Sequence, residues 1–505
     1  MKVDPRTPCI VGVAARTWHP EAVGVAGAPE PLDMWEHVAR RAAADAGNAT
    51  MLGALDSIQI VYCQTWQYDD AVARLAERLG ADPRHRHYSG IGGTTTQQLV
   101  NETSEAMLRG EMDLALITSA EALATKRRRK RDGERWVGSF PPADKRPFPW
   151  ESPPDPVEVA HEVFQAWLTF AVFDNARRAE LGIGLDDYRA EIGEMLAPMT
   201  RIAANNPNAW YRVERSAREI VEARPENRMV GYPYTKYMVA VMDVDMAGAL
   251  LLATHERADA LGIPQEQRVY PRGWCYARDP VLVAEHADLG RSPAMVAAAA
   301  EAFRVAGIGI DDVGHLDLYS CFASSLHFAR DALGLASGDS RGLTVTGGLP
   351  YHGGPASGYL THSIAAMVDR LRADRDTAGL VSGVGMHMTK HVFGVYAAAP
   401  GRVELPDASA AQAVADRAGR ARVVAEHDGD ATVGAYSVVH GRDGQPEWAL
   451  LVCDLAGGAR TYAQVRDPAL CRAAEATELV GTTVQLETRT VNGPAGEQRV
   501  NLATW

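Results

Sequence analysis

Two distant stretches of the chain show the same order of expected helices and strands. The first contains a helix, an apolar strand, a helix, a Gly/Thr-rich turn, a helix and a strand, at residues 32–47, 55–63, 71–80, 89–96, 97–110 and 112–122. The second has the same elements around a Gly-rich stretch, at residues 294–307, 313–321, 324–335, 345–359, 360–372 and 378–388. This alternation predicts α/β packing with largely parallel sheets. We expect the two copies to pack face to face, because each has an apolar side that it cannot bury alone.

The regions outside the two copies predict further domains, since a chain of 505 residues is too long for one ordinary core. Helical and proline-rich stretches separate the copies, and an insertion of this size usually shapes a substrate site. After Gly401 the sequence changes to β-rich runs joined by a turn, which predicts a small β domain, with an OB-like barrel as one of several possible barrels. We therefore expect a first half, an insertion with a link, a second half and a β-rich OB-like domain, at residues 1–125, 126–272, 273–404 and 405–505.

Composition excludes several classes of function. The formal net charge of -13 disfavours nucleic-acid binding, which needs a surplus of Lys and Arg. The six cysteines are scattered without a CxxC pair, so neither a disulfide framework nor a structural zinc site is expected. No apolar run is long enough to span a bilayer, and the N-terminus has Asp and Pro where a signal peptide would be apolar. We expect a soluble cytoplasmic protein with no metal, nucleic-acid or membrane partner.

The Gly/Thr-rich turn of the first copy resembles the turn that carries the nucleophilic Cys in thiolases. In that family two similar halves form five layers with an inserted loop domain, and the resemblance covers about residues 5 to 400. A Cys at a helix N-terminus is chemically sensible, because the helix dipole and free N–H groups lower its pKa. The matching position here is Gly93, followed by Thr94, and no Cys is near. Thr94 could cap the helix, but without an activating base a Thr is a weak nucleophile.

The other thiolase blocks are altered as well. The Asn-Glu-Ala-Phe or His-Asp-Cys-Phe block is replaced by Tyr319-Ser320-Cys321-Phe322, and Gly354 stands where the Gly-His-Pro block has its His. The final Cys-x-Gly block appears as Ser382-Gly383-Val384-Gly385. This pattern, with residues 227–238 and 388–396, is similar to the thiolase-like proteins often called acetyl-CoA acetyltransferases. The backbone scaffold is expected to be kept without the nucleophile and its base.

The resemblance implies an acyl-CoA-binding protein of lipid metabolism, nominally an acyltransferase, in which ordinary thiolysis is lost. Two alternatives stay open. One is an enzyme that cleaves or forms a carbon–carbon bond in a 3-hydroxyacyl-CoA by retro-aldol chemistry. The other is a non-catalytic scaffold whose C-terminal domain recruits a protein partner. We expect coenzyme A to bind in the cleft between the second Gly-rich loop and the insertion.

Three residues are candidate catalytic groups. Tyr319 stands where relatives have a catalytic Asn or His, so its phenol could serve an enolate oxygen, or it could be an ordinary strand-end Tyr. Tyr359 lies in a Gly-Tyr-x-x-His-like loop resembling that of Tyr-dependent thiolase-fold lyases. His352 is the imidazole near the vacated Gly-His-Pro position, with a solvated loop His as the alternative. Cys321 is expected to be a buried, inert thiol.

A second set of residues is expected to contact coenzyme A. Arg128 belongs to a basic run at residues 126–131 that could bind phosphates or be a solvated surface. His391 could line the pocket or have a structural role. The expected ligand-contacting residues are Gly93, Thr94, Arg128, Phe322, Gly354, Gly385 and His391.

Overall fold

The first half of the molecule is built on a five-stranded sheet. The computed structural model describes residues 3–24, 26–151, 154–336, 338–402, 404–493 and 496–505. The strand order is β1-β7-β4-β2-β3, with bounds β1 Pro8–Thr17, β2 Ser57–Ile60, β3 His85–Tyr88, β4 Leu114–Ala122 and β7 Asp245–Thr254. The β4–β2 and β2–β3 pairs are parallel, whereas β1–β7 and β7–β4 are antiparallel.

The second half repeats this arrangement in a four-stranded sheet. Its order is β8-β11-β10-β9, with bounds β8 Tyr270–Arg278, β9 Val313–Asp317, β10 Ala378–Gly385 and β11 Lys390–Ala397. Here β9–β10 is parallel, while β10–β11 and β11–β8 are antiparallel. The internal repeat is therefore confirmed, but the expectation of largely parallel sheets is wrong. Each half adds two antiparallel strands that lie outside the repeated sequence pattern.

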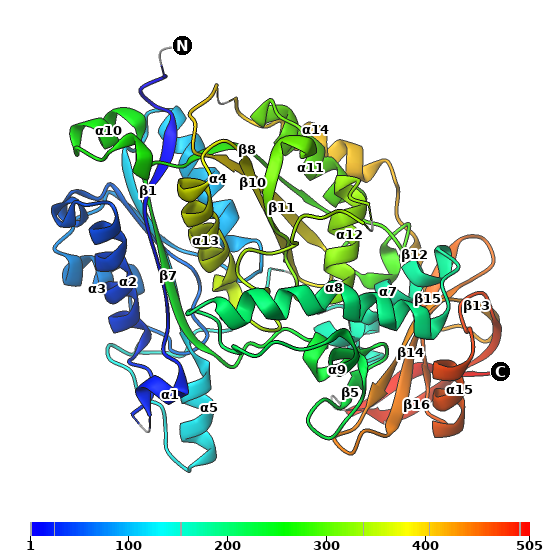
Figure 1. The fold of residues 1–505 in the computed structure, drawn as a ribbon. Coiled ribbons are helices and arrows are strands. Elements are labelled where there is room, and N and C mark those ends of the chain that lie inside the picture. Colours follow the sequence, from blue (N-terminus) through cyan, green and yellow to red (C-terminus); the bar gives the residue numbers. More distant parts are fainter. Residues whose placement is uncertain (1–2, 25, 152–153, 337, 403, 494–495) are drawn as a thin grey trace.

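Five layers result from the way helices cover the two sheets. The helices α4 (Thr95–Leu108) and α13 (Tyr359–Ala373) contact each other and strands of both sheets, so they form the central layer (Figure 1). The outer layers contain α2 (Pro31–Asp45) and α3 (Ala71–Leu79) on one side and α11 (Pro293–Ala306) and α12 (Ala323–Leu333) on the other. The Gly-rich turns of both copies directly precede the two central helices, which brings the turns together inside the molecule.

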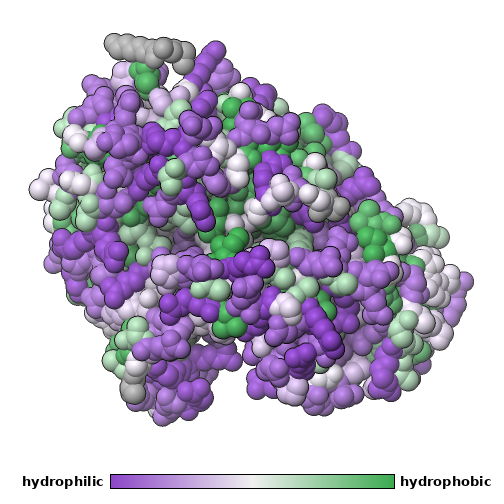
Figure 2. Space-filling view, in the orientation of Figure 1, coloured by the Kyte–Doolittle hydropathy of each residue, from purple (hydrophilic) through white to green (hydrophobic). Residues whose placement is uncertain are grey.

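The inserted region ends earlier than its expected limit at residue 272, because β7 completes the sheet of the first half. Its elements are α5 Leu123–Arg131, α6 Pro156–Ala160, α7 Ala166–Glu180, α8 Leu185–Asn205, α9 Ala217–Val221, β5 Met229–Gly231 and β6 Tyr234–Thr235. The short helices α1 (Pro20–Val23) and α10 (His255–Ala260) flank the first half. Among the described residues, no helix combines the length and apolar character needed to cross a membrane. Most of the face in Figure 2 is hydrophilic.

The C-terminal region is a small β domain, as expected. Its elements are α14 Ala408–Asp416, β12 Arg422–Val423, β13 Gly429–His440, β14 Pro446–Asp454, β15 Ala459–Val465, α15 Pro468–Ala476, β16 Thr483–Gly493 and β17 Gly496–Thr504. Five strands pair in a closed ring, β13-β14-β15-β17-β16, which returns to β13. The domain is not isolated, because β13 also pairs with β5 of the insertion and α14 packs on α11.

Helix α7 connects this β domain to the rest of the molecule. On one side the Asn175 amide donates to the Tyr436 carbonyl (2.9 Å), and Arg178 forms a two-pronged ion pair with Glu478 (2.6 and 2.8 Å). Toward the other side, the Thr169 hydroxyl lies 2.7 Å from the His387 imidazole in the turn between β10 and β11. The β domain therefore packs on the insertion, one helix away from the strand ends where the thiolase-like motifs meet.

Candidate functional site

The space that a side chain at position 93 would occupy is filled by Tyr319. A Cβ built at Gly93 would lie 2.6 Å from the Tyr319 Cζ atom and would overlap the Tyr319 hydroxyl and the Val384 carbonyl oxygen. The turn bends through Gly92, whose φ of +150° is uncommon for any other residue. A nucleophilic Cys is thus absent from this turn and is also sterically excluded by the tyrosine that replaces the second motif.

Tyr319 presents a protonated, unengaged hydroxyl. It follows β9, its side chain is buried, and its backbone is fixed by the hydroxyls of Ser382 (2.9 Å) and Ser325 (2.7 Å). Its own hydroxyl makes no hydrogen bond within the described part of the chain. Burial raises the pKa of Tyr319 well above its ordinary value. The phenol is therefore an O–H donor at neutral pH and cannot serve as a ready base.

Tyr359, the first residue of α13, is held differently. Its ring packs edge-on against that of Tyr319, with centroids 5.6 Å apart. Its hydroxyl donates to Asp317 Oδ1 (2.9 Å) and lies 2.7 Å from the Thr346 hydroxyl. The buried Asp317 also accepts from the backbone N–H groups of Val345 and Thr346, which shapes the second Gly-rich loop. Because its hydroxyl is committed to this network, the geometry does not support Tyr359 as an acid–base residue.

His352 is buried, and its ring centroid is 6.1 Å from that of Tyr359. Tyr359 therefore lies between His352 and Tyr319, whose hydroxyl is at the Gly93 turn. A Cβ at Gly354 would meet the Leu349 side chain at 2.9 Å, so this position holds no imidazole without repacking. The alternative that His352 is a solvated loop residue is wrong, because its side chain is buried. Neither His352 nor Gly354 supplies a base beside the Gly93 turn.

Lys390 is a charged residue beside the turn, and it is not among the residues predicted from the sequence. Its ammonium lies 3.6 Å from the position of a Cβ at Gly92, and the side chain is buried and ion-paired with Glu151 of the insertion. Successive strand residues point to opposite faces. The His391 ring accordingly faces away, 3.0 Å from the Met388 carbonyl and 3.0 Å from Asp279, which is a structural role. The alternation of strand residues 390–397 therefore predicts that Lys390 and His391 lie on opposite faces of β11.

The remaining motif residues are structural in character. The Cys321 thiol is buried and 3.6 Å from the Ser325 hydroxyl, and burial raises the pKa of Cys321 to about 12, so the thiol is inert at neutral pH. The Phe322 ring packs 4.7 Å from that of Phe170 in α7. The Thr94 hydroxyl donates to Gln98 and does not cap α4. Gly385 lies beside the Gly93 backbone, where a Cβ would be 3.6 Å from the Gly93 nitrogen.

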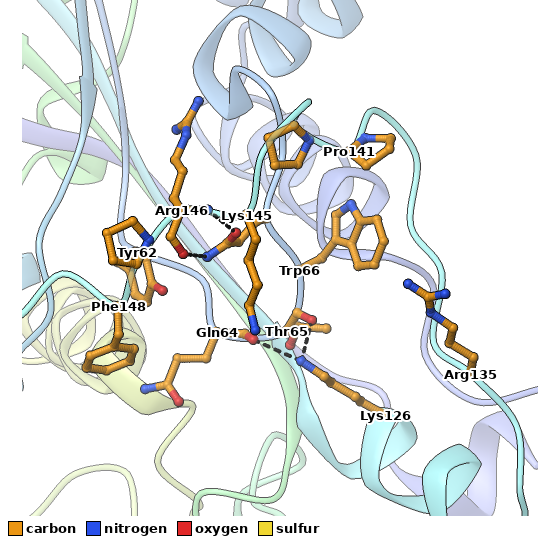
Figure 3. A pocket seen from close by; sticks show the side chains of 13 residues that line it. Tyr62, Gln64, Thr65, Trp66, Lys126, Arg135, Pro141, Lys145, Arg146 and Phe148 are labelled. Carbon is orange, nitrogen blue, oxygen red and sulfur yellow. Dashed lines mark hydrogen bonds between the residues drawn. The ribbon is translucent and has the colours of Figure 1, made fainter.

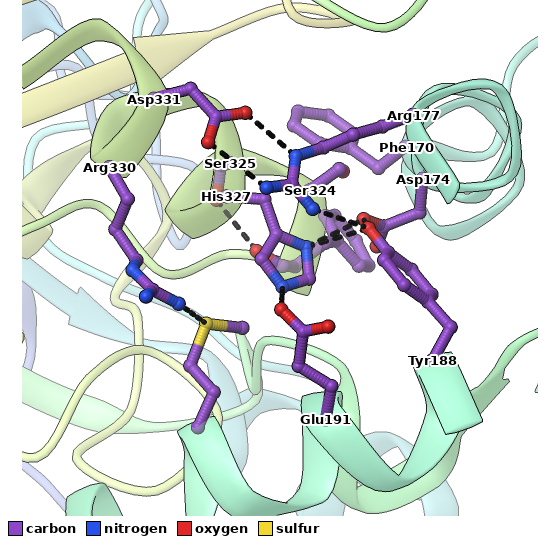
Figure 4. A network of polar contacts seen from close by, with 12 residues as sticks. Phe170, Asp174, Arg177, Tyr188, Glu191, Ser324, Ser325, His327, Arg330 and Asp331 are labelled. Atoms are coloured by element: carbon purple, nitrogen blue, oxygen red, sulfur yellow. Dashed lines mark hydrogen bonds and ion pairs between the residues drawn. The ribbon is translucent and has the colours of Figure 1, made fainter. Parts of the chain in front are cut away.

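A buried polar network behind this motif joins the insertion to the second half (Figure 4). Asp174 of α7 accepts from the Tyr188 hydroxyl (2.7 Å) and pairs with His327 Nδ1 of α12 (2.9 Å). The Tyr234 hydroxyl bonds to Asp174 and lies 3.2 Å from Ser324. The network fixes α7 and α8 against α12. It thereby also fixes the position of Phe170 in α7, against which Phe322 packs.

A hollow of about 850 Å³, which we call the first hollow, lies between the loop after β2 and the start of the insertion (Figure 3). Basic and aromatic side chains line it, namely Lys126, Arg135, Lys145, Arg146, Tyr62, Trp66 and Phe148. The Phe148 ring is 4.7 Å from that of Trp150, and the next residue, Glu151, reaches Lys390. The first hollow is therefore linked by a short segment to the Gly92–Gly93 turn.

The basic run at residues 126–131 forms α5, and most of it binds the chain itself. Lys126 donates to the carbonyls of Gln64 (3.1 Å) and Thr65 (2.7 Å) at the edge of the first hollow. Arg127 pairs with Asp243, and Arg128 donates to the Gly24 carbonyl (2.9 Å). Of this run, only Lys126 lines the first hollow. The sequence did not indicate Arg135 and Lys145, which come from the loop that follows.

A second hollow of about 1030 Å³ lies between α13 and the C-terminal end of α8, with β1 and α2 beside it. It occupies the place where coenzyme A was expected, since Val345 and His352 of the second Gly-rich loop line it together with residues 201–202 and 205–208 of the insertion. It is separated from the Gly93 turn by the rings of Tyr359 and Tyr319.

Comparison with solved structures decides the family. A monomeric SCP2-thiolase-like protein type 1 from Mycobacterium smegmatis matches with a TM-score of 0.84 and 31% identity, and the match covers 100% of both chains. The chain belongs to the SCP2-thiolase-like proteins. This family assignment covers the C-terminal β domain too, because the match extends over the whole of both chains. No protein-family model and no curated protein matches this SCP2-thiolase-like chain.

Two more distant structures share the fold over about four fifths of this SCP2-thiolase-like protein. An Ltp2–ChsH2(DUF35) aldolase matches 78% of this chain and 98% of its own, at 16% identity and a TM-score of 0.60. An acetyl-CoA acetyltransferase from Syntrophomonas wolfei matches 79% of this chain and 100% of its own, at 14% identity and a TM-score of 0.55. The expected thiolase fold, with two similar halves, an insertion and an added β domain, is thus confirmed.

Proposed function

We propose that the protein binds an acyl-CoA and does not catalyse ordinary thiolysis. The observation that carries the second part is the Tyr319 hydroxyl, which stands where the side chain of a nucleophile at position 93 would be. General-base and nucleophile losses each remove orders of magnitude in rate. A ligand of this kind would belong to lipid metabolism in the cytoplasm, and the name acyltransferase would then describe the ancestry of the fold only.

The first hollow is the place that we assign to the phosphates of coenzyme A. Within the described ranges, Lys145 and Arg135 have no ion-pair partner, so their charges are available to phosphate oxygens. Trp66 and Phe148 offer flat apolar faces for the adenine ring. The thioester would then pass Phe148 and Trp150 toward the Gly92–Gly93 turn. The second hollow is a poorer choice, because two buried tyrosine rings separate it from that turn.

At the turn, the Tyr319 hydroxyl, which has no hydrogen-bond partner among the described residues, would donate to the thioester oxygen. This arrangement also supports the second candidate, a carbon–carbon lyase. In that reaction water takes the proton of the 3-hydroxyl, and the C3 oxygen becomes a carbonyl as the C2–C3 bond breaks. The electron pair of that bond forms the thioester enolate, which Tyr319 would stabilise by donation until C2 takes up a proton. The likeness to an aldolase of the same fold agrees with this candidate. Tyr359 takes no part in it as proposed here.

The C-terminal β domain is proposed to be an OB-type barrel that serves as a partner within the same chain. Its closed ring of five strands, with α15 between the third and the fourth, supports that assignment. Its contacts with α7 would stabilise the wall of the site. A pure scaffold without catalysis is the remaining alternative, and it requires acyl-CoA binding without any turnover.

The binding proposal is tested by titration calorimetry with coenzyme A and acetyl-CoA. Lys145→Glu should weaken binding at least tenfold, and more strongly at low salt, because charge pairs near the surface are screened. Arg131→Glu is the matched control: it reverses one charge in the nearby basic run without touching the first hollow. Equal affinity of the two variants would place the phosphates elsewhere. Robust cleavage of acetoacetyl-CoA that is abolished by Cys321→Ala would overturn the loss of thiolysis.

A further inference from the structure

The second hollow has a floor of two buried histidines that the proposed function does not use. The side chains of His352 and His362 are each 1% exposed, both line the hollow, and their ring centroids are 5.4 Å apart. In the described chain, neither ring nitrogen of His362 has a hydrogen-bond partner, nor does Nε2 of His352. Buried polar atoms left unpaired are costly, so such a cluster calls for a partner from outside the chain.

The hydrogen bonds of Asn206 determine what His352 offers. The Asn206 amino group donates to the Thr346 carbonyl (2.8 Å), and its carbonyl oxygen accepts from the Asn208 N–H (2.9 Å). The amino group therefore also faces Nδ1 of His352, at 3.3 Å, which makes Nδ1 an acceptor and places the proton on Nε2. Burial lowers the pKa of both rings, for His362 to about 4, so each is neutral at pH 7 and carries one N–H. Nε2–H of His352 is thus a donor, and is unsuited to bind a metal.

The mouth of the second hollow carries unbalanced positive charge. Arg41 and Arg370 line it, and neither has an ion-pair partner among the residues that the structure describes. The two acidic residues nearby, Asp45 and Asp369, share a single cation, Arg372, at 2.9 and 3.6 Å, so these five groups together leave an excess of one positive charge. The chain as a whole has a formal net charge of -13. The second hollow is locally positive by contrast, with Arg41 and Arg370 at its mouth and N–H donors on its floor.

We propose that the second hollow is a separate binding site for a small anion with carboxylate or phosphate oxygens. Its oxygens would accept from Nε2–H of His352 and from the N–H of His362, and Arg41 and Arg370 would balance its charge. Small apolar side chains, among them Ala365 and Ala366, form the wall and leave room for a short carbon skeleton. This site goes beyond acyl-CoA binding, because Tyr359 and Tyr319 separate it from the Gly93 turn.

The experiment measures binding of inorganic phosphate and of succinate to the full chain by calorimetry, at constant ionic strength in chloride. We expect one of the two to bind, which identifies the source of the oxygens. Arg370→Glu at the mouth and His362→Phe on the floor should each weaken that binding at least tenfold. Arg442→Glu, a charge reversal on an exposed turn of the β domain, is the control and should leave it unchanged.

Three results would overturn the proposal. The first is no binding of either anion, and the second is binding that Arg370→Glu, a surface change that should not affect folding, leaves intact. The third is loss of coenzyme A affinity in Arg370→Glu together with competition between coenzyme A and the anion, since the second hollow would then be the coenzyme site. That third result would also move the coenzyme away from the first hollow, whereas failure of acyl-CoA binding alone would leave the anion site standing.

Discussion

At the scale of single residues, Gly93 and Tyr319 depend on each other, because the Tyr319 side chain occupies the space that a side chain at position 93 would need. A Cys at position 93 would overlap the Tyr319 hydroxyl, so Gly93→Cys should lower the free energy of unfolding by about 1–3 kcal/mol, as overpacking does. Adding Tyr319→Asn should recover part of that loss by vacating the space. Gly90→Cys is the control, because a Cβ there meets nothing within 4 Å. Urea unfolding that finds Gly93→Cys as stable as Gly90→Cys would show that Tyr319 moves aside freely.

Tyr319 and Tyr359 differ in the hydrogen bonds of their hydroxyls, so a Tyr→Phe change should affect the stability of the protein differently at the two positions. Tyr359→Phe removes a donor from the buried Asp317 and should cost about 1–3 kcal/mol of stability. Tyr319→Phe breaks no hydrogen bond in the described chain, so it should change stability by less than about 0.5 kcal/mol. Tyr319→Phe should nevertheless abolish any lyase turnover while acyl-CoA binding is retained. The opposite order of stabilities in urea unfolding would contradict these roles.

The sequence could locate these residues but not their partners. Tyr319, Tyr359 and the two turns were found because each lies in a motif. The buried network around Asp317 could not be predicted, since its members come from a strand end, a loop and a helix that meet only in the folded chain. Lys390 is not predicted for a simpler reason: its burial and its ion pair with Glu151 of the distant insertion exist only in the folded chain.

At the scale of elements, the repeat predicted the central helices and the parallel strands, but not the antiparallel strands that complete each sheet. The strand β7 was assigned to the insertion because it follows that region in sequence, although in space it lies between β1 and β4. Its ten residues are all buried, and such an apolar run carries no alternation that would indicate its neighbours. Pairing across a long insertion is therefore not readable from the local sequence.

The end of β4 gives a pH-dependent prediction at this scale. The buried Glu121 carboxylate accepts from the Gln64 and Thr65 N–H groups and so holds the loop after β2. Burial raises the pKa of Glu121 to about 7, so the native chain keeps a proton that the unfolded chain releases near pH 4.5. Stability from this group falls as pH rises from about 4.5 to 7, by about 3 kcal/mol in total.

Glu121→Gln should remove that slope, although an amide in place of the carboxyl also sets an NH₂ group among N–H donors and lowers stability at every pH. Urea unfolding at pH 5.5 and 8.0 measures the difference in free energy for each variant. Glu77→Gln, on the exposed face of α3, is the control and should keep the slope of the parent chain. A parent chain whose stability changes equally with and without Glu121 would show that other groups set its pH dependence.

At the scale of the whole molecule, the C-terminal β domain and the α/β body share structure and are expected to unfold together. The β domain extends its sheet with β5 of the insertion, and α7 contacts it on one side and the second half on the other. The SCP2-thiolase-like relative that matches over its full length is described as monomeric.

Calorimetry should accordingly show one cooperative transition for the full chain, and Arg178→Ala should disturb it. Arg178 is 2% exposed and joins α7 to Glu478 of the β domain, so its loss leaves a gap and an unpaired carboxylate at the interface. We expect the β domain to melt first in this variant, as a separate transition a few degrees lower. Arg499→Ala, which breaks an exposed pair with Glu426, should leave a single transition because such pairs contribute little. Two transitions already present in the parent chain would mean that the shared sheet does not couple the domains.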